Sequence, residues 1–170
     1  TMISAFRFPR ATLPIAVNLR ELLAVVPALV AMVVMIIILP DAETITWRWL
    51  LVVPVVALQY LLNLGISLLL APIVATVTDV ANLITFGMRI WLYASGVFYS
   101  YERFTQNPQL LAVLELNPMH QVLDMTRDLM LYERLPEAGS WLILGGWAAG
   151  LFAVGFIVFW LREEKLGKES

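Results

Sequence analysis

Two groups of side chains in this sequence have residue types and spacing that could support chemistry. His120, Asp124 and Asp128 recur at intervals of four, so a helix would bring them onto one face. An imidazole with two carboxylates could ligate a metal ion or exchange protons with a substrate. The alternative is the solvated face of an amphipathic helix, with Arg127 and Asp124 as partial charge partners. This alternative is favoured, because His120 is the only histidine and no second cluster completes a metal site.

The second group is a stripe of polar and aromatic residues. Seven residues are spaced alternately by three and four positions and therefore share one helix face: Asp79, Asn82, Phe86, Arg89, Tyr93, Gly96 and Ser100. At membrane depth, Arg89 would cost at least about 2.5–3.5 kcal/mol if it faced lipid. It therefore either pairs inside a helix bundle or lines a path and attracts an anionic substrate. Nearby aromatic residues such as Trp91 and Tyr99 are typical interface anchors, and in a conduit they would offer flat faces to sugar rings or lipid.

The composition shows which elements must position these groups. Of the 170 residues, 61% are hydrophobic and only 14% are charged, and the mean hydropathy is +0.83. Soluble domains are about 45–50% apolar and about 25% charged, so this composition argues strongly against a soluble globular enzyme, a disordered chain and a disulfide-stapled module. Without cysteine, the chain has no thiol chemistry or thiolate zinc site. The net charge of −2 gives no basic surface for nucleic acid.

Four uncharged or nearly uncharged segments are long enough to cross a bilayer, at residues 22–40, 49–78, 80–101 and 138–161. We expect the second to end near Pro72. The prediction is therefore an all-α polytopic membrane protein with both ends on one side. Those ends carry Arg7, Arg10, Arg20, Arg162, Lys165 and Lys168. The positive-inside rule then places both ends in the cytoplasm and residues 102–139 outside.

The segment between the last two spans carries two helix-start signals. Asn107-Pro108 and Asn117-Pro118 each combine a good N-cap with proline at the first helical position. They predict two short helices, at residues 108–116 and 118–133, that lie in or dip into the outer interface. In the last span, Gly146 and Gly150 form a G-x-x-x-G pattern, which predicts close approach of another helix, with dimerisation as a further option.

The first twenty residues are basic and aromatic. Phe8, Pro9 and Arg10 precede the first span, where such a segment touches anionic lipid or docks a protein partner. No P-loop pattern occurs in the chain, so any ATP that powers it must bind another chain. The sequence begins with Thr1, and we expect that a longer protein has lost its front.

Taken in order, these features resemble a known family. Phe8-Pro9-Arg10 with Leu13-Pro14 is similar to the Phe-Pro-Arg-x-x-Leu-Pro segment of type-2 ABC exporter permeases, in particular those that export O-antigen and teichoic acid. Thr78-Asp79-Val80 resembles their Arg-Asp-Ile/Val cytoplasmic turn, with Thr78 where arginine is usual. Residues 91–99 resemble their Trp-x-x-x-Ser-Pro-x-x-Tyr stretch, with Gly96 in place of proline. Asn117-Pro118 matches their Asn-Pro after the outer loop.

This resemblance implies a single, partial permease domain over residues 1–170, whose four spans would be helices three to six of a six-helix subunit. It implies a homodimer with two ATPase subunits that bind ATP and magnesium, and no cofactor in this chain. Residues 1–20 would be a coupling segment, and residues 102–139 would form the outer gate. The residues that contact the ATPase would be Phe8, Pro9, Arg10 and Asp79. The conduit would be lined by Arg89, Phe86, Tyr93, Trp91 and Tyr99. The outer gate would include Asn117 and Pro118.

The expected function is export of polyprenyl-diphosphate-linked polysaccharide, for lipopolysaccharide or the cell wall, across a bacterial cytoplasmic membrane. Actinobacterial galactan permeases are similar in the region of Arg89 and the tyrosine-rich run. One alternative is a type-2 ABC exporter of drugs or lipids. Another is a membrane-embedded enzyme that acts on a polyprenyl lipid through His120, Asp124 and Asp128. Activity of the protein in membranes without an ATPase partner would favour the enzyme. A neighbouring reading frame with Walker motifs would favour an exporter.

Overall fold

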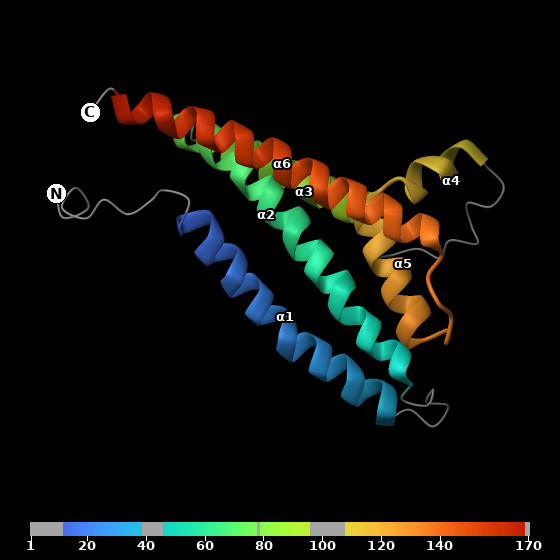
Figure 1. The fold of residues 1–170 in the computed structure, drawn as a ribbon. Coiled ribbons are helices and arrows are strands. Elements are labelled where there is room, and N and C mark those ends of the chain that lie inside the picture. Colours follow the sequence, from blue (N-terminus) through green and yellow to red (C-terminus); the bar gives the residue numbers. More distant parts are fainter. Residues whose placement is uncertain (1–11, 39–45, 78, 96–107, 169–170) are drawn as a thin grey trace.

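The computed structural model describes residues 12–38, 46–77, 79–95 and 108–168, and every regular element in these ranges is helical (Figure 1). The chain is therefore an all-α polytopic membrane protein, as predicted. Its elements, in chain order, are α1 (Thr12–Ile38), the 3-10 helix η2 (Trp47–Leu51), α2 (Val52–Thr76), α3 (Val80–Ala94), α4 (Pro108–Glu115), α5 (Pro118–Met130) and α6 (Ala138–Lys168).

Three helical stretches within the described residues are long and apolar enough to cross a membrane: Thr12–Ile38, Trp47–Thr76 and Ala138–Arg162. Two boundaries differ from the sequence-based expectation. α1 begins at Thr12 rather than at residue 22, because the charges of Arg20 and Glu21 mark where a helix leaves lipid and do not end it. Pro72 lies inside α2, which continues to Thr76, so this proline does not end the helix.

The remaining predicted span, residues 80–101, is represented by α3. Its 15 residues extend over about 22 Å, which is less than the roughly 30 Å thickness of the hydrocarbon layer. The predicted part beyond Ser95 lies outside the described residues. Within the described part, α3 therefore crosses only some of the membrane depth, and three spans are shown where four were expected.

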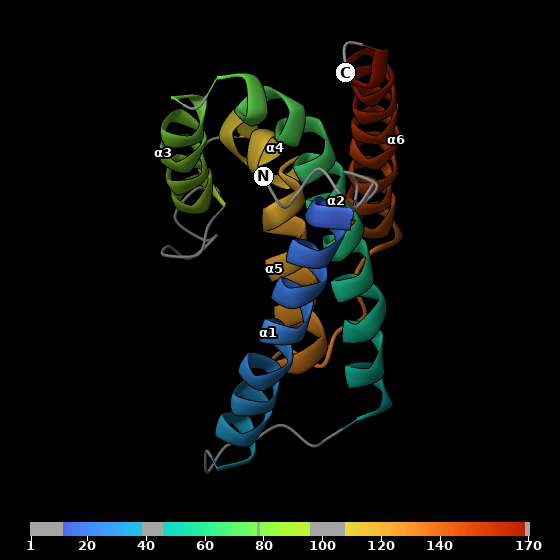
Figure 2. The same ribbon diagram turned by 90° about the vertical axis from the view of Figure 1, so that its left-hand side faces the viewer.

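The helices alternate in direction, so two ends of the molecule can be distinguished. One end of the molecule holds the start of α1, the turn between α2 and α3, and the end of α6 (Figure 1). The other end holds the end of α1, η2, and the loop between α5 and α6. We call this second end the hairpin end. In the orthogonal view α3 stands to one side of α1, α2 and α6 (Figure 2). The start of α1 and the end of α6 therefore lie on the same side of the described structure.

α2 and α6 run side by side and cross where two glycines meet. A Cβ atom added to Gly65 would lie 2.5 Å from the backbone nitrogen of Phe152. A Cβ atom added to Gly155 would collide with the carbonyl oxygen of Gly65 and lie 3.2 Å from the backbone nitrogen of Leu69. Small residues at such a crossing let two backbones touch, which is how helices pack in a membrane. The predicted pair, Gly146 and Gly150, has open space around it, so it does not form this contact.

The apolar core lies nearer the hairpin end. It consists of Ile36 from α1, Val52 and Val55 from the α2 region, Val122, Met125, Leu129 and Met130 from α5, and Leu144 from α6.

At the opposite end, one buried polar side chain joins two spans. Asn18 of α1 donates a 2.8 Å hydrogen bond to the hydroxyl of Ser67 in α2 and another of 2.8 Å to the carbonyl of Pro14. Because a membrane interior offers no water, such a bond fixes the pairing of α1 with α2.

Candidate functional site

The first part of the candidate site is the hairpin formed by α4 and α5. Both helices begin where the Asn-Pro signals predict, at Pro108 and Pro118. Asn117 has an extended backbone and its side-chain oxygen accepts a 3.0 Å hydrogen bond from the amide of Met119, so it is an N-cap. Pro118 is buried at the first position of α5.

α5 ends at Met130 and not at residue 133, for a local reason. The carbonyl of Arg127 accepts hydrogen bonds from the amides of Leu131 and Tyr132, which closes the last turn of the helix. Glu133 then has φ of 49°, a left-handed conformation that interrupts a helix. The guanidinium of Arg48, in η2, donates a hydrogen bond to the carbonyl of Glu133. This bond ties the end of α5 to the start of α2.

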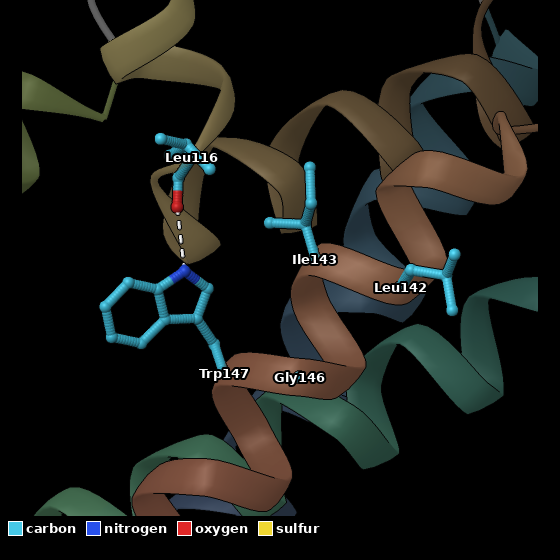
Figure 3. Close-up of a pocket in the computed structure, with 5 residues that line it drawn as sticks. All are labelled: Leu116, Leu142, Ile143, Gly146 and Trp147. Atoms are coloured by element: carbon cyan, nitrogen blue, oxygen red, sulfur yellow. Dashed lines mark hydrogen bonds between the residues drawn. The ribbon is translucent and has the colours of Figure 1, made fainter.

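Two tryptophans from different helices bind adjacent residues of the α4–α5 turn. The indole of Trp91, in α3, donates a 2.8 Å hydrogen bond to the side-chain oxygen of Asn117. The indole of Trp147, in α6, donates a 2.9 Å hydrogen bond to the carbonyl of Leu116 (Figure 3). A cavity of about 340 Å³ lies beside this second bond, between the turn and α6, and Leu116, Leu142, Ile143, Gly146 and Trp147 line it.

The position of Trp147 indicates the depth of the hairpin. Trp147 lies nine residues into α6, which starts at Ala138, so its Cα lies roughly 14 Å along the helix axis from the hairpin end. The turn at Leu116 reaches the same depth, because the Trp147 indole binds its carbonyl. α5 then returns toward the hairpin end, where the chain enters α6. The tip of the hairpin therefore lies alongside α6, nine residues past its start, which is the arrangement expected if the hairpin dips into the membrane.

His120 does not lie on a solvated face, so that prediction is wrong for this residue. His120 is only 5% exposed, and its Nδ1 lies 3.3 Å from the carbonyl oxygen of Ser95, at the end of α3. Asp124 and Asp128 are half-buried. Burial raises the pKa of Asp128 above 3.8, and the neighbouring charge of Asp124 raises it further, against the opposing effect of Arg134. Among the described residues no group of three or more potential ligands could hold a metal ion.

The second part of the candidate site is the exposed face of α3. Phe86 is 61% and Tyr93 63% exposed, and Arg89 between them is also exposed. Trp91 is only two positions from Arg89, a rotation of about 200° around the helix, so it lies on a different side. The structure therefore divides the predicted conduit set: Phe86, Arg89 and Tyr93 share an exposed face, whereas Trp91 contacts the hairpin.

The remaining predicted residues lie elsewhere. Asp79 is exposed and immediately precedes α3, in the short turn after α2. Tyr99, Phe8, Pro9 and Arg10 lie outside the described residues. Sequence reasoning did not find the Trp91–Asn117 and Trp147–Leu116 bonds, since an indole in an apolar helix is most often an anchor. It also missed Gly65 and Gly155, because an isolated glycine in an apolar helix carries little signal without its partner.

Comparison with known proteins identifies the class. Residues 5–131 match the family model described as ABC-2 type transporter, so the chain belongs to this family. The chain is also similar to the O-antigen export system permease protein RfbA of Myxococcus xanthus, with 25% identity over 167 residues. This alignment covers 98% of the chain and 64% of the relative, so the chain spans about two thirds of that protein's length. No solved structure matches the chain.

Proposed function

We propose that this protein is the transmembrane subunit of an ATP-driven exporter that moves a polyprenyl-diphosphate-linked polysaccharide across a bacterial cytoplasmic membrane. The observation that carries the proposal is the exposed face of α3, where an exposed arginine lies between two exposed aromatic rings. Arginine binds phosphate oxygens through paired N–H donors, and aromatic faces stack on sugar rings. The similarity to an O-antigen export permease over nearly the whole chain supports the same cargo class.

The proposal includes partners that supply energy and complete the conduit. A separate nucleotide-binding subunit hydrolyses ATP with magnesium and contacts Asp79, at the end of the molecule where α1 starts. It also contacts Phe8, Pro9 and Arg10, which precede α1 in the sequence, and this end is then cytoplasmic. A second copy of the chain faces α3 across the conduit, with Phe86, Arg89 and Tyr93 as lining. Asn117 and Pro118, at the tip of the re-entrant hairpin, belong to the outer gate. These roles follow from the motifs, and the geometry of the hairpin supports the last of them.

The decisive experiment compares substitutions at Arg89 in the protein co-purified with its nucleotide-binding subunit and reconstituted in proteoliposomes. Export of a polyprenyl-diphosphate glycan is measured per assembled complex. If Arg89 binds the diphosphate, Arg89→Lys keeps part of the export because a cation remains, and Arg89→Gln loses far more at equal assembly. Arg162→Gln is the matched control, because it removes an exposed arginine at the end of the span in α6.

The same experiment separates this proposal from its rivals. If Arg89→Gln exports cargo as well as the unsubstituted protein at equal assembly, Arg89 does not line the conduit. Reduced assembly of Arg89→Gln would instead assign Arg89 a structural role. Transport of drugs or free lipids without glycan transport would favour the alternative exporter. Among the described residues nothing favours the enzyme alternative, because His120 is buried against α3 and apart from solvent.

A further inference from the structure

α3 is the least embedded of the long helices, and its attachments are therefore informative. None of the residues from Val80 to Ala94 is buried. One end of α3 follows α2 after a short turn, and the helix stands apart from α1 and α6 in the orthogonal view (Figure 2). At its other end, α3 meets the start of α5. A helix attached in this way transmits a displacement mainly through its two ends.

The contact between α3 and α5 has two polar points. At the first, the Trp91 indole binds the side-chain oxygen of Asn117, which also accepts the amide of Met119, so both lone pairs of this oxygen are used. At the second, His120 Nδ1 approaches the carbonyl of Ser95. Ser95 is fully buried and His120 is 5% exposed. Separating α3 from α5 would break both of these polar contacts in a region that offers little water.

We propose that Trp91, Ser95, Asn117 and His120 form an α3–α5 latch that stays closed during transport, so that α3 and the tip of the re-entrant hairpin move as one body. The proposal deepens the proposed function, on which it rests, by giving the outer gate a mechanical link to the conduit helix. Trp91 and Asn117 are positioning residues in this account, and neither has to touch the cargo.

On its other side the hairpin faces α6. The contact between the α4–α5 turn and α6 shows where a displacement of the hairpin tip would be accommodated. Among the described residues, α6 bonds to the turn through the Trp147 indole and the carbonyl of Leu116, and Leu144 of α6 also packs against α5 in the apolar core. The cavity beside that bond lies between the turn and α6, and Gly146 on its wall has no side chain to fill it (Figure 3). The tip of the hairpin therefore has open space beside its bond to α6, whereas a part-buried indole bond and a buried histidine contact join it to α3.

The latch is tested by distance measurement, which needs no knowledge of the cargo. Spin labels are placed at Ile90 on α3 and at Leu131 just after α5, both exposed positions, in a chain without native cysteine. Labelled protein is diluted with unlabelled protein so that most complexes carry one labelled copy. Pulsed electron resonance on the complex with its nucleotide-binding subunit should then give one narrow distance distribution, unchanged by ATP and vanadate. Trp91→Phe should increase the unlatched population about five- to tenfold, the effect of losing one hydrogen bond. Trp147→Phe removes an indole bond from the same turn and should leave the distribution unchanged.

Variants at Asn117 separate positioning from capping. Asn117→Ser keeps an N-cap but is too short to reach Trp91, so it should behave as Trp91→Phe does. Asn117→Asp keeps both the cap and the acceptor and should retain the narrow distribution. In the proteoliposome assay, Trp91→Phe should hydrolyse ATP normally but export several-fold less cargo per ATP.

Each possible result decides a separate point. A distance that changes with nucleotide in otherwise unsubstituted protein would overturn the latch, as would equal behaviour of Trp91→Phe and Trp147→Phe. If the latch distances behave as expected but the unsubstituted complex exports no lipid-linked glycan, the proposed cargo is wrong and the latch stands.

Discussion

The glycine crossing between α2 and α6 gives the sharpest prediction about stability. Gly155→Ala would place a methyl group against the backbone of Gly65, 3.1 Å from its carbonyl carbon as well as in collision with its oxygen. The neighbouring atoms belong to the backbone, so no side chain can rotate away and the two helices must separate. Gly146→Ala and Gly150→Ala place the same methyl group in open space on the same helix.

The matched design isolates the cost of the crossing. All three variants gain the same advantage of alanine over glycine in a helix, about 0.8–1.0 kcal/mol, so this contribution cancels in their comparison. The difference between Gly155→Ala and Gly146→Ala is then the overpacking cost, about 1–3 kcal/mol. For a chain of this size, 1 kcal/mol corresponds to about 2–4 °C in Tm. We therefore expect Gly155→Ala to melt on the order of 2–12 °C below Gly146→Ala.

The assay is thermal unfolding of the purified protein in detergent, followed by tryptophan fluorescence and by the fraction that remains monodisperse. Gly65→Ala is the reciprocal test, because its methyl group would lie 2.6 Å from the carbonyl carbon of Leu151. It should be destabilised to a similar extent. A Tm for Gly155→Ala equal to or above that of Gly146→Ala would refute the assignment of this crossing as the main contact between α2 and α6.

Two further predictions concern topology and pH. In intact cells, an impermeant thiol reagent should modify Tyr132→Cys at the hairpin end and leave Arg162→Cys at the other end unmodified, and the reverse pattern would reject the assigned orientation. Because burial and Asp124 raise the pKa of Asp128 in the folded protein, Asp128 contributes most to stability below pH 3.8, and this contribution is lost as the pH rises through the raised folded-state pKa. Asp128→Asn should therefore melt no lower than the unsubstituted protein at pH 8 and lose its relative advantage near pH 4. A clear loss of Tm at pH 8 would show that the attraction between Asp128 and the charge of Arg134 outweighs the cost of burial.

Local signals predicted those features that depend on a few neighbouring residues. The starts of α4 and α5 follow from Asn-Pro, because the asparagine oxygen and the proline ring act within three residues of each other. The start of α6 at Ala138 follows from the beginning of its apolar run. The predicted start of the first span, at residue 22, differs from the start of α1 at Thr12. A charge limits the part of a helix that lies in lipid, but backbone hydrogen bonding lets the helix itself extend beyond the lipid.

Features that depend on a distant partner could not be predicted in the same way. A G-x-x-x-G pattern shows that Gly146 and Gly150 permit a close approach, but only the fold shows that α2 approaches α6 elsewhere, at Gly155. The burial of His120 likewise depends on a carbonyl 25 residues away in the chain. The spacing of His120, Asp124 and Asp128 was correct as helical geometry, yet it could not show which part of that face another helix covers.

The exposure of Arg89 limits the settings in which α3 can function. A guanidinium that faced lipid near the middle of a span would cost at least about 2.5–3.5 kcal/mol, and no described residue of this chain forms an ion pair or hydrogen bond with it. A latch to α5 through Trp91 fixes the opposite side of the helix and keeps Arg89 from turning inward. The charge must therefore be met by water, by another subunit or by an anionic cargo. All three would be present at the proposed conduit between two copies, whereas lipid alone provides none of them.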